Sequence, residues 1–175
     1  MTEQVLVATD GSDMSGKAVE MAARIAASFK APMTVVHVLM HGSRAEEASR
    51  LAEVEHLVDH VSATAMPNLG NVPGSMQDLL GASRNADETA RIVSALGDRI
   101  AEDAANRSRE MGVSSVDVRV VAGDCAESIL DTARDIGADL IVMGSRGLGG
   151  LKGLLLGSVS SKVSQHATCS VLTVR

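Results

Sequence analysis

A glycine-rich segment near the carboxyl end of the chain combines residue types that can hold a phosphate group. It runs from Gly144 to Ser158 and has six glycines within fourteen residues, between the apolar run 140–143 and a helical pattern. Glycine lets successive backbone N–H groups turn toward an anion, and a helix amino terminus adds unpaired donors and partial positive charge. Hydroxyl groups follow at Ser158, Ser160 and Ser161. The segment therefore predicts a phosphate cradle.

Other interpretations of these glycines were weighed against phosphate binding. They could form a flexible connector or a site of close backbone packing, but the strand–loop–helix setting favours a phosphate site. No Gly-Lys-Ser/Thr ending is present, so the segment is not a Walker A loop, and it does not fit a short GxGxxG dinucleotide turn. Arg146 and Lys152 are either phosphate partners or solvated cations, and both alternatives stay open.

The elements around this segment alternate between buried strands and amphipathic helices. Apolar runs predict strands at 5–8, 34–39, 116–121, 140–143 and 171–174. The first helix is expected to be capped at Ser12, Asp13 or Ser15 and to carry an apolar stripe of Ala18, Met21, Ala22, Ile25 and Phe29. Further helices are expected around 129–136 and 159–166. This alternation predicts a parallel sheet with helices on both faces.

The middle of the chain departs from this rhythm, because residues 41 to about 111 contain no strand pattern. The stripe Val93, Leu96, Ile100 and Ala104 predicts the crossover helix. Residues 42–83 are interpreted as an insertion that begins with a helical stripe and continues into a stretch rich in proline, glycine and asparagine. We expect one domain over 1–175 that carries this insertion.

Composition narrows the classes of function. The 175 residues, 45% of them hydrophobic, suit one soluble domain. A net charge of −6 without any basic run disfavours nucleic acid and anionic membranes, and no run approaches the ~18 apolar residues of a membrane span. A cytoplasmic protein is expected. Phe29 is the only aromatic residue, so alanines and methionines must fill the core.

Cysteine and histidine give no pattern of a metal or redox centre. Cys125 and Cys169 are isolated and are expected to be small buried hydrophobic residues. His37 lies in a predicted buried strand, where a satisfied core histidine is favoured over a catalyst. His56 and His60 are four residues apart, as in a zinc pair, but lack the HExxH arrangement, so no metal site is expected.

Three blocks of the sequence together resemble the ATP-binding universal stress proteins. The signature of that group is Gly, two residues, Gly, nine residues, then Gly and Ser or Thr. Its fixed positions are occupied by Gly144, Gly147, Gly157 and Ser158. Residues 7–12 resemble the first strand and turn of the family, and 166–175 resemble its ending. The resemblance covers about 3–40 and 87–175 and leaves the insertion out.

The resemblance implies a Rossmann-like α/β fold, an open five-stranded parallel sheet in the order 3-2-1-4-5. The first and fourth strands then lie side by side at the point where the strand order reverses, which is where such sheets bind ligands. The loops 9–12 and 144–158 follow these two strands. Both would border one cleft.

The resemblance also implies ATP as the ligand, with Mg²⁺ on its phosphates. Ala8, Thr9 and Asp10 would line the ribose and adenine side, and the backbone of Val38 would contact adenine. The ribose would meet Met143 and Gly144, and the phosphates Gly147, Gly157, Ser158 and Val159. Ser160 is either a further contact or an exposed helix residue. Asp10 could instead cap the first helix or fix the turn.

The function implied is that of a stress-response regulatory protein, acting through nucleotide-dependent conformation and partner contacts. The resemblance leaves slow ATP hydrolysis open for this chain, because family members vary in this, but no poised base or nucleophile is visible, so no catalytic residue is assigned. Two alternatives stay open: an ATP-hydrolysing enzyme with the insertion as its lid, and a nucleotide-independent interaction module. A homodimer through strand 171–174 is implied, since an edge strand exposes unpaired backbone. Ser170 stands where the family often has proline. The insertion could bind a protein partner.

Overall fold

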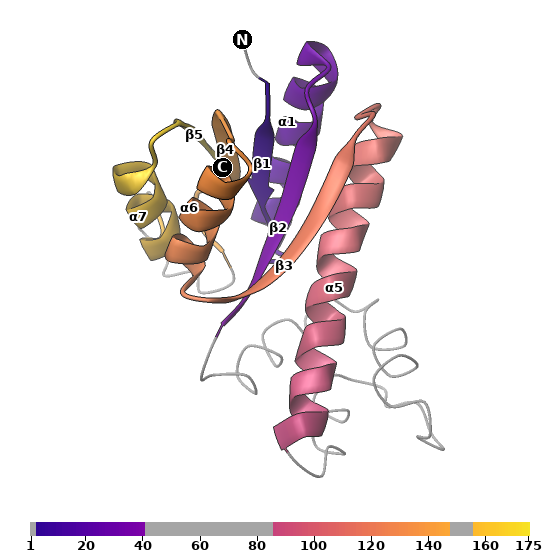
Figure 1. Ribbon diagram of the computed structural model, residues 1–175, viewed down its shortest axis with the longest axis vertical. Helices are drawn as coiled ribbons and strands as arrows, with labels where there is room; N and C mark the ends of the chain where they lie inside the picture. Colours follow the sequence, from indigo (N-terminus) through magenta and orange to yellow (C-terminus); the bar gives the residue numbers. More distant parts are fainter. Residues whose placement is uncertain (1–2, 41–85, 148–155) are drawn as a thin grey trace.

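Five parallel strands form one sheet with helices on both faces (Figure 1). The computed structural model describes residues 3–40, 86–147 and 156–175, so the predicted insertion lies outside the described residues. The elements, in chain order, are β1 (Val5–Ala8), α1 (Asp13–Phe29), β2 (Met33–Met40), α5 (Ala86–Glu110), β3 (Val116–Gly123), α6 (Cys125–Asp135), β4 (Leu140–Gly144), α7 (Ser158–His166) and β5 (Ser170–Val174). The strand order β3-β2-β1-β4-β5 confirms the predicted topology.

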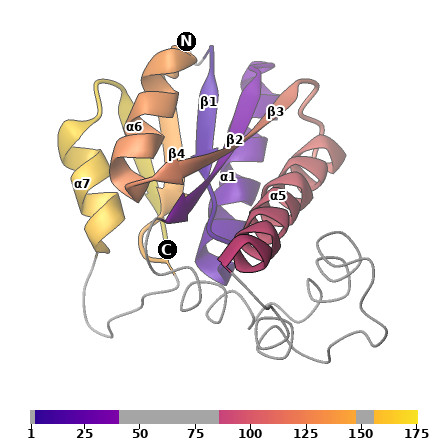
Figure 2. The ribbon, with the colours of Figure 1, turned by 60° about the horizontal axis from the view of Figure 1, so that its bottom comes forward.

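β1 is the central strand, and it lies between β2 and β4 (Figure 2). Ala8 is aligned with Val36 of β2 on one side and with Met143 of β4 on the other. The chain passes from β1 to β2 in one direction across the sheet and from β4 to β5 in the other. The strand order therefore reverses between β1 and β4, and the loops that follow these two strands are neighbours.

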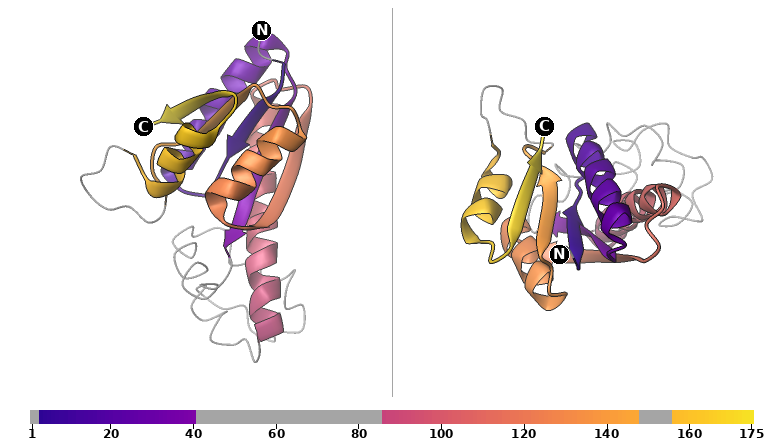
Figure 3. Two further views of the ribbon diagram at one scale, coloured as in Figure 1. Left: turned by 60° about the vertical axis from the view of Figure 1, so that its left-hand side comes forward. Right: turned by 90° about the horizontal axis from the view of Figure 1, so that it is seen from above.

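The helices form two layers: α1 and α5 cover one face of the sheet, and α6 and α7 cover the other (Figure 3). Alanine fills much of the first layer, at Ala18, Ala22, Ala23, Ala26, Ala101, Ala104 and Ala105. Larger apolar side chains such as Leu6, Ile129 and Ile141 fill the second. The prediction that alanine fills the core is confirmed. Among the described methionines, Met33 and Met143 are the buried ones.

The predicted apolar stripe of α1 is wrong at two of its positions. Phe29 is 54% exposed and Met21 is 39% exposed. The buried face instead runs through Ala18, Ala22 and Ala26, whose spacing of four residues places them on one side of a helix. Small side chains let α1 lie close to the sheet, and the two large apolar residues stand at the margin of this contact.

Helix α5 runs past the carboxyl end of the sheet (Figure 1) and packs closely on β2 through Gly97. A Cβ atom at Gly97 would lie 2.6 Å from Leu39 Cδ2 and 2.9 Å from His37 Cδ2. Side chains essentially never approach so closely. The glycine in the middle of this helix therefore sets the distance between α5 and β2.

Two glycines inside helices make a matched pair for testing this packing. A Cβ at Gly16 of α1 would meet Arg107 Nη1 at 3.8 Å and nothing nearer. Gly16→Ala should therefore raise the free energy of unfolding by about 0.5–1 kcal/mol, because alanine favours helix. Gly97→Ala should lower it by about 1–3 kcal/mol through overpacking. Urea unfolding followed by circular dichroism measures both, and a change of the same sign in the two variants would contradict the packing described for α5.

Candidate functional site

The loop after β1 is held in one shape by its own side chains. Asp10 Oδ1 accepts hydrogen bonds from the N–H of Ser12 at 3.1 Å and from its hydroxyl at 2.6 Å. Thr9 Oγ1 accepts from the N–H of Gly11 at 3.3 Å and lies 3.1 Å from the hydroxyl of Ser15. Gly11 has φ +81°, a conformation that other residues rarely adopt. Asp10 thus fixes the turn, as one sequence alternative held, while Ser12 caps α1.

His37 of β2 lies next to this loop and is bonded to it. Its Nδ1 is 2.9 Å from the carbonyl oxygen of Thr9. A carbonyl oxygen only accepts, so the bond requires the proton on Nδ1 and leaves Nε2 as an acceptor. Nε2 is buried and has no hydrogen-bond partner within the part of the chain that the structure describes. His37 is buried as predicted, but the expectation that it is satisfied is wrong for Nε2. A buried acceptor without a partner costs about 1–3 kcal/mol.

The surroundings of His37 keep its ring uncharged. Burial lowers the pKa of His37 below its ordinary value of 6.5, against the opposing effects of the Thr9 carbonyl and the negative charges of Asp10 and Asp98. Only 2% of the side chain is exposed, so solvent offers the imidazolium no compensation. The ring is therefore neutral at neutral pH.

Ser145 joins the two described ends of the glycine-rich segment. Its carbonyl oxygen accepts from the N–H of Gly157 and from the hydroxyl of Ser160, each at 2.7 Å. Its own N–H donates to the carbonyl oxygen of Val174 in β5 at 2.7 Å. The end of β4 and the start of α7 are thereby tied to each other and to the neighbouring strand.

The amino terminus of α7 has no side-chain cap. The N-cap residue is Gly157, which makes no capping hydrogen bond, and the first turn carries no acidic residue. Ser158 is exposed at this end of the helix. Ser160 is 2% exposed, and its hydroxyl donates to the carbonyl of Ser145, so the alternative of an exposed helix residue is wrong. An uncapped helix start with partial positive charge suits an anion.

The loops after β1 and β4 meet at Gly147. A Cβ atom there would overlap the Oδ2 atom of Asp10. At Gly144, a Cβ would lie 3.0 Å from Met14 Cγ and 2.9 Å from the carbonyl oxygen of Arg146. Two of the signature glycines therefore stand where the β4 loop approaches the β1 loop and the start of α1. The structure thus brings the loop after β1 and the described ends of the loop after β4 together at the carboxyl ends of these strands, where we place the candidate crevice.

The remaining predicted site residues border the same region. Ala8 and Met143 are paired across β1 and β4 and are buried, and Val38 is 8% exposed near the carboxyl end of β2. Val159 packs against the apolar layer under α6 and α7. The predicted candidates that lie outside the described residues are Lys152, His56 and His60.

Sequence reasoning missed two parts of this region. Ser145 occupies an unspecified position of the glycine motif, and its part in the site depends on a backbone carbonyl, which carries no sequence signal. The second is the bond from His37 to Thr9. Here a signal existed, because a histidine inside an apolar run must place its polar ring atoms somewhere.

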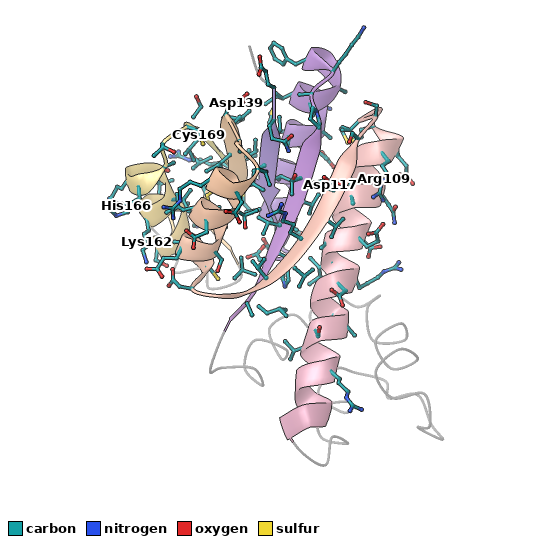
Figure 4. The ribbon with its side chains drawn as sticks, viewed as in Figure 1. Arg109, Asp117, Asp139, Lys162, His166 and Cys169 are labelled. Atoms are coloured by element: carbon teal, nitrogen blue, oxygen red, sulfur yellow. The ribbon has the colours of Figure 1, made fainter. Side chains whose placement is uncertain are left out.

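An exposed ion-pair cluster fixes α7 against α6. Lys162, labelled on α7 in Figure 4, has its Nζ 3.2 Å from Asp124 Oδ1 and 3.1 Å from Glu127 Oε1. Hydrogen bonds to Glu127 and Asp124 raise the pKa of Lys162. The backbone N–H of Glu127, followed by Lys162, lowers the pKa of Asp124, which is also the N-cap of α6. These ion pairs link the middle of α7, whose amino terminus lies beside the β4 loop, to the start of α6.

A separate pocket of about 420 Å³ opens at the other end of the sheet, beside the amino ends of β4 and β5. Its lining includes Arg134, His166 and Cys169, the last two labelled in Figure 4. Arg134 is already paired with Asp131 of its own helix. Burial raises the pKa of the Cys169 thiol, which keeps it protonated and weakly nucleophilic. Arg134 and Cys169 therefore give no sign of a catalytic or ligand-binding site in this pocket.

Residues 3–40, 86–147 and 156–175 show neither a metal-binding cluster nor a membrane-spanning helix. There, no three histidine, cysteine or acidic side chains gather in a way that could hold a metal ion. None of the helices described is both long enough and apolar enough to span a bilayer.

The fold is that of an α/β protein in which the loops after β1 and β4 lie together at the topological switch point of a parallel sheet, the place where such sheets bind ligands. The profile of the universal stress protein family matches residues 1–175. The chain belongs to the universal stress protein family.

Relatives and solved structures match over nearly the whole chain. The universal stress protein YxiE of Bacillus subtilis is 36% identical over 175 residues, covering all of both chains. Universal stress protein Rv1636 of Mycobacterium tuberculosis is 31% identical and covers 97% of this chain and 94% of its own. A universal stress protein solved in complex with cAMP has 27% identity and a TM-score of 0.63, covering 99% of this chain and 97% of its own.

The neutral state of His37 predicts a pH dependence of stability. Its pKa is lower in the folded than in the unfolded protein, so below pH 6.5 the unfolded chain binds the proton first. The free energy of unfolding should therefore decrease as the pH is lowered below about 6.5. The decrease should be up to about 1.4 kcal/mol per pH unit, until the lowered pKa of His37 is reached. The His37→Asn variant should show a shallower slope. Urea unfolding at several pH values measures this, and parallel curves for the two proteins would contradict it.

Proposed function

We propose that this protein binds ATP in the crevice between the β1 loop and the β4 loop and acts as a stress-response regulator whose partner contacts depend on the bound nucleotide. The observation that carries the proposal is the meeting of Gly147 with the carboxylate of Asp10, beside the uncapped start of α7. A carboxylate suited to ribose hydroxyls and a helix terminus suited to phosphates then lie in one crevice.

The described residues suit the phosphate end of a nucleotide. Gly147 has no Cβ and so lets the Asp10 carboxylate approach the β4 loop, and Gly157 offers the first N–H groups of α7 no side-chain acceptor of its own. Ser158 adds an exposed hydroxyl at the same helix start. Ser160 supports these groups through Ser145 and does not reach the phosphates with its hydroxyl. Phosphate binding thus rests mainly on backbone donors.

The other end of the nucleotide would lie along the strand ends. Asp10 and Thr9 would face the ribose, with Met143 and Gly144 on the opposite side, because β1 and β4 are paired at Ala8 and Met143. Adenine would lie toward β2, where Val38 would contact it through its backbone. Backbone contacts of this kind can distinguish adenine from guanine by their donor and acceptor pattern.

Mg²⁺ would arrive with the nucleotide and be held chiefly by its phosphates. The described residues form no cluster of three acidic or histidine ligands of their own. The Ser158 hydroxyl at the phosphate end is an oxygen donor of the kind that Mg²⁺ accepts. Bound there, the ion would neutralise phosphate charge.

A nucleotide-bound relative supports the proposal. The universal stress protein solved with cAMP shares the fold over nearly all of this chain. Its ligand contains adenine, ribose and a phosphate, which are the parts for which we assign the crevice. The triphosphate is inferred from the second half of the glycine signature, Gly157 and Ser158.

The proposed partner contact includes a second copy of this chain at β5. This strand pairs with β4 on one side and is the edge of the sheet on the other. Val171, Leu172 and Val174 are only partly buried there. An edge strand with apolar side chains and unpaired backbone is normally covered, and pairing with its equal in a dimer would do so.

Calorimetric titration with MgATP, compared with MgGTP, tests the proposed site. Wild-type protein freed of nucleotide should bind ATP saturably and in preference to GTP. Gly147→Ala should weaken ATP binding roughly tenfold or more, because its Cβ would displace the Asp10 carboxylate. The chain has no Trp or Tyr, so residual adenine is easily detected by ultraviolet absorbance.

Two further variants belong to the same titration: Gly157→Ala tests for a ligand at the start of α7, and Gly16→Ala is the control. Among the described residues, a Cβ at Gly157 would meet other atoms only at 3.4 Å or beyond, so this variant should fold normally and lose affinity only if a ligand occupies the space. Gly16→Ala should bind as the wild type does. Absence of heat for the wild type over a wide ATP range, at two temperatures, would refute the proposal.

A further inference from the structure

We propose that His37 is a positioning residue of the nucleotide site, which holds the Thr9 carbonyl and so sets the place of the Asp10 loop, with Gly97 of α5 providing the space for its ring. The inference rests on the proposed function, since it adds a residue to the same site. His37 does not touch the ligand in this assignment and acts through the loop.

The first step is the end of β1. The strand ends at Ala8, yet the next residue stays attached to β2 by both of its backbone groups. The N–H of Thr9 donates to the carbonyl oxygen of Val36 at 3.0 Å, and the carbonyl of Thr9 accepts from His37 Nδ1 at 2.9 Å. A side chain thus holds the last carbonyl before the loop turns away from the sheet. An apolar residue at position 37 would offer it no donor.

The second step leads from Thr9 to the crevice. Asp10 is the next residue, and its Oδ1 is used within the loop to hold Ser12. Its Oδ2 stands against Gly147 of the other loop. A rotation of the peptide between Thr9 and Asp10 would therefore move the carboxylate that meets the glycine segment. The His37 bond is the direct restraint on that peptide from β2.

The third step is the placement of the ring. Gly97 lies against it, because a Cβ at that position would be 2.9 Å from His37 Cδ2 and 3.3 Å from Nε2. One helical turn later, Ile100 lies against the loop itself, with its Cδ1 3.2 Å from where a Cβ of Gly11 would be. Helix α5 therefore packs against both His37 and the loop to which His37 is hydrogen-bonded.

The Nε2 atom has no hydrogen-bond partner among the described residues, so the polar interaction that accounts for the position of the ring is the bond from Nδ1 to Thr9. An apolar side chain at position 37 would remove this unsatisfied acceptor and would suit a buried central strand. Among the described residues, the hydrogen bond that the histidine gains in return is the one to Thr9. Because the side chain is 2% exposed, it has no access to a bound substrate as an acid or base.

Two substitutions distinguish the effect of losing the hydrogen bond from the effect of losing the volume of the ring. The amide nitrogen of His37→Asn stands as many bonds from the backbone as Nδ1 and can donate to Thr9, whereas His37→Leu cannot donate. Asparagine is the smaller of the two and leaves the larger cavity. If cavity formation governed the result, His37→Asn would be the worse variant, whereas the proposed bond makes His37→Leu the worse one.

The measurements are MgATP affinity by calorimetry and hydrogen exchange of the Gly11 and Ser12 amides in the nucleotide-free protein, with folding checked by circular dichroism. His37→Leu should raise the Kd for ATP by roughly two- to tenfold, the effect of one hydrogen bond, and speed exchange in the loop. His37→Asn should stay within about twofold of the wild type in affinity and protect both amides.

Equal affinity in the wild type and His37→Leu would overturn the proposal, as would an equal loss in both variants. If the wild type binds no ATP, the proposed function fails, and the exchange data decide on His37 alone. Faster exchange confined to His37→Leu would then support its hold on the loop. Equal exchange in all three proteins would overturn it.

Discussion

The parallel pairing of β1 with β4 is the constraint on which the rest of the structure depends. All four residues of β1 are buried, and its register places Ala8 level with Met143. A slip of one residue would turn every side chain of β1 to the opposite face and carry Thr9 and Asp10 away from the glycine segment. Because both faces of this strand are packed under helices, such a slip would disrupt two apolar layers at once.

Local sequence patterns predicted the elements well, and the family resemblance predicted their order. The run Val5–Ala8 and the run ending at Met143 are uniformly apolar and are followed by glycine-containing turns, which is typical of buried parallel strands. Strand order is a long-range property that no periodicity contains. The same limit applies to the bond from His37 to Thr9, whose partners are 28 residues apart.

Residue type was a weaker guide to the direction in which a side chain points. The sequence leaves Ser160 as either a phosphate contact or an exposed residue, but its hydroxyl donates to the carbonyl oxygen of Ser145. The carbonyl of Ser145 is available to Ser160 because the start of α7 lies beside the end of β4 in the folded chain. On α1, apolar character was recognised at Met21 and Phe29, but the short distance between helix and sheet decides which apolar residues fit beneath it.

The alanine layer between the sheet and helices α1 and α5 has a consequence for evolution. Alanine has no rotamers to lose on folding, so this layer is ordered at little entropic cost, but it also has no side-chain freedom with which to absorb a larger neighbour. Any enlargement must move a whole helix as a rigid body. Since α1 begins at the loop that carries Asp10 and Ser12, drift in the interior of this protein would be transmitted to the proposed nucleotide site, and selection on that site should restrain substitutions far from it.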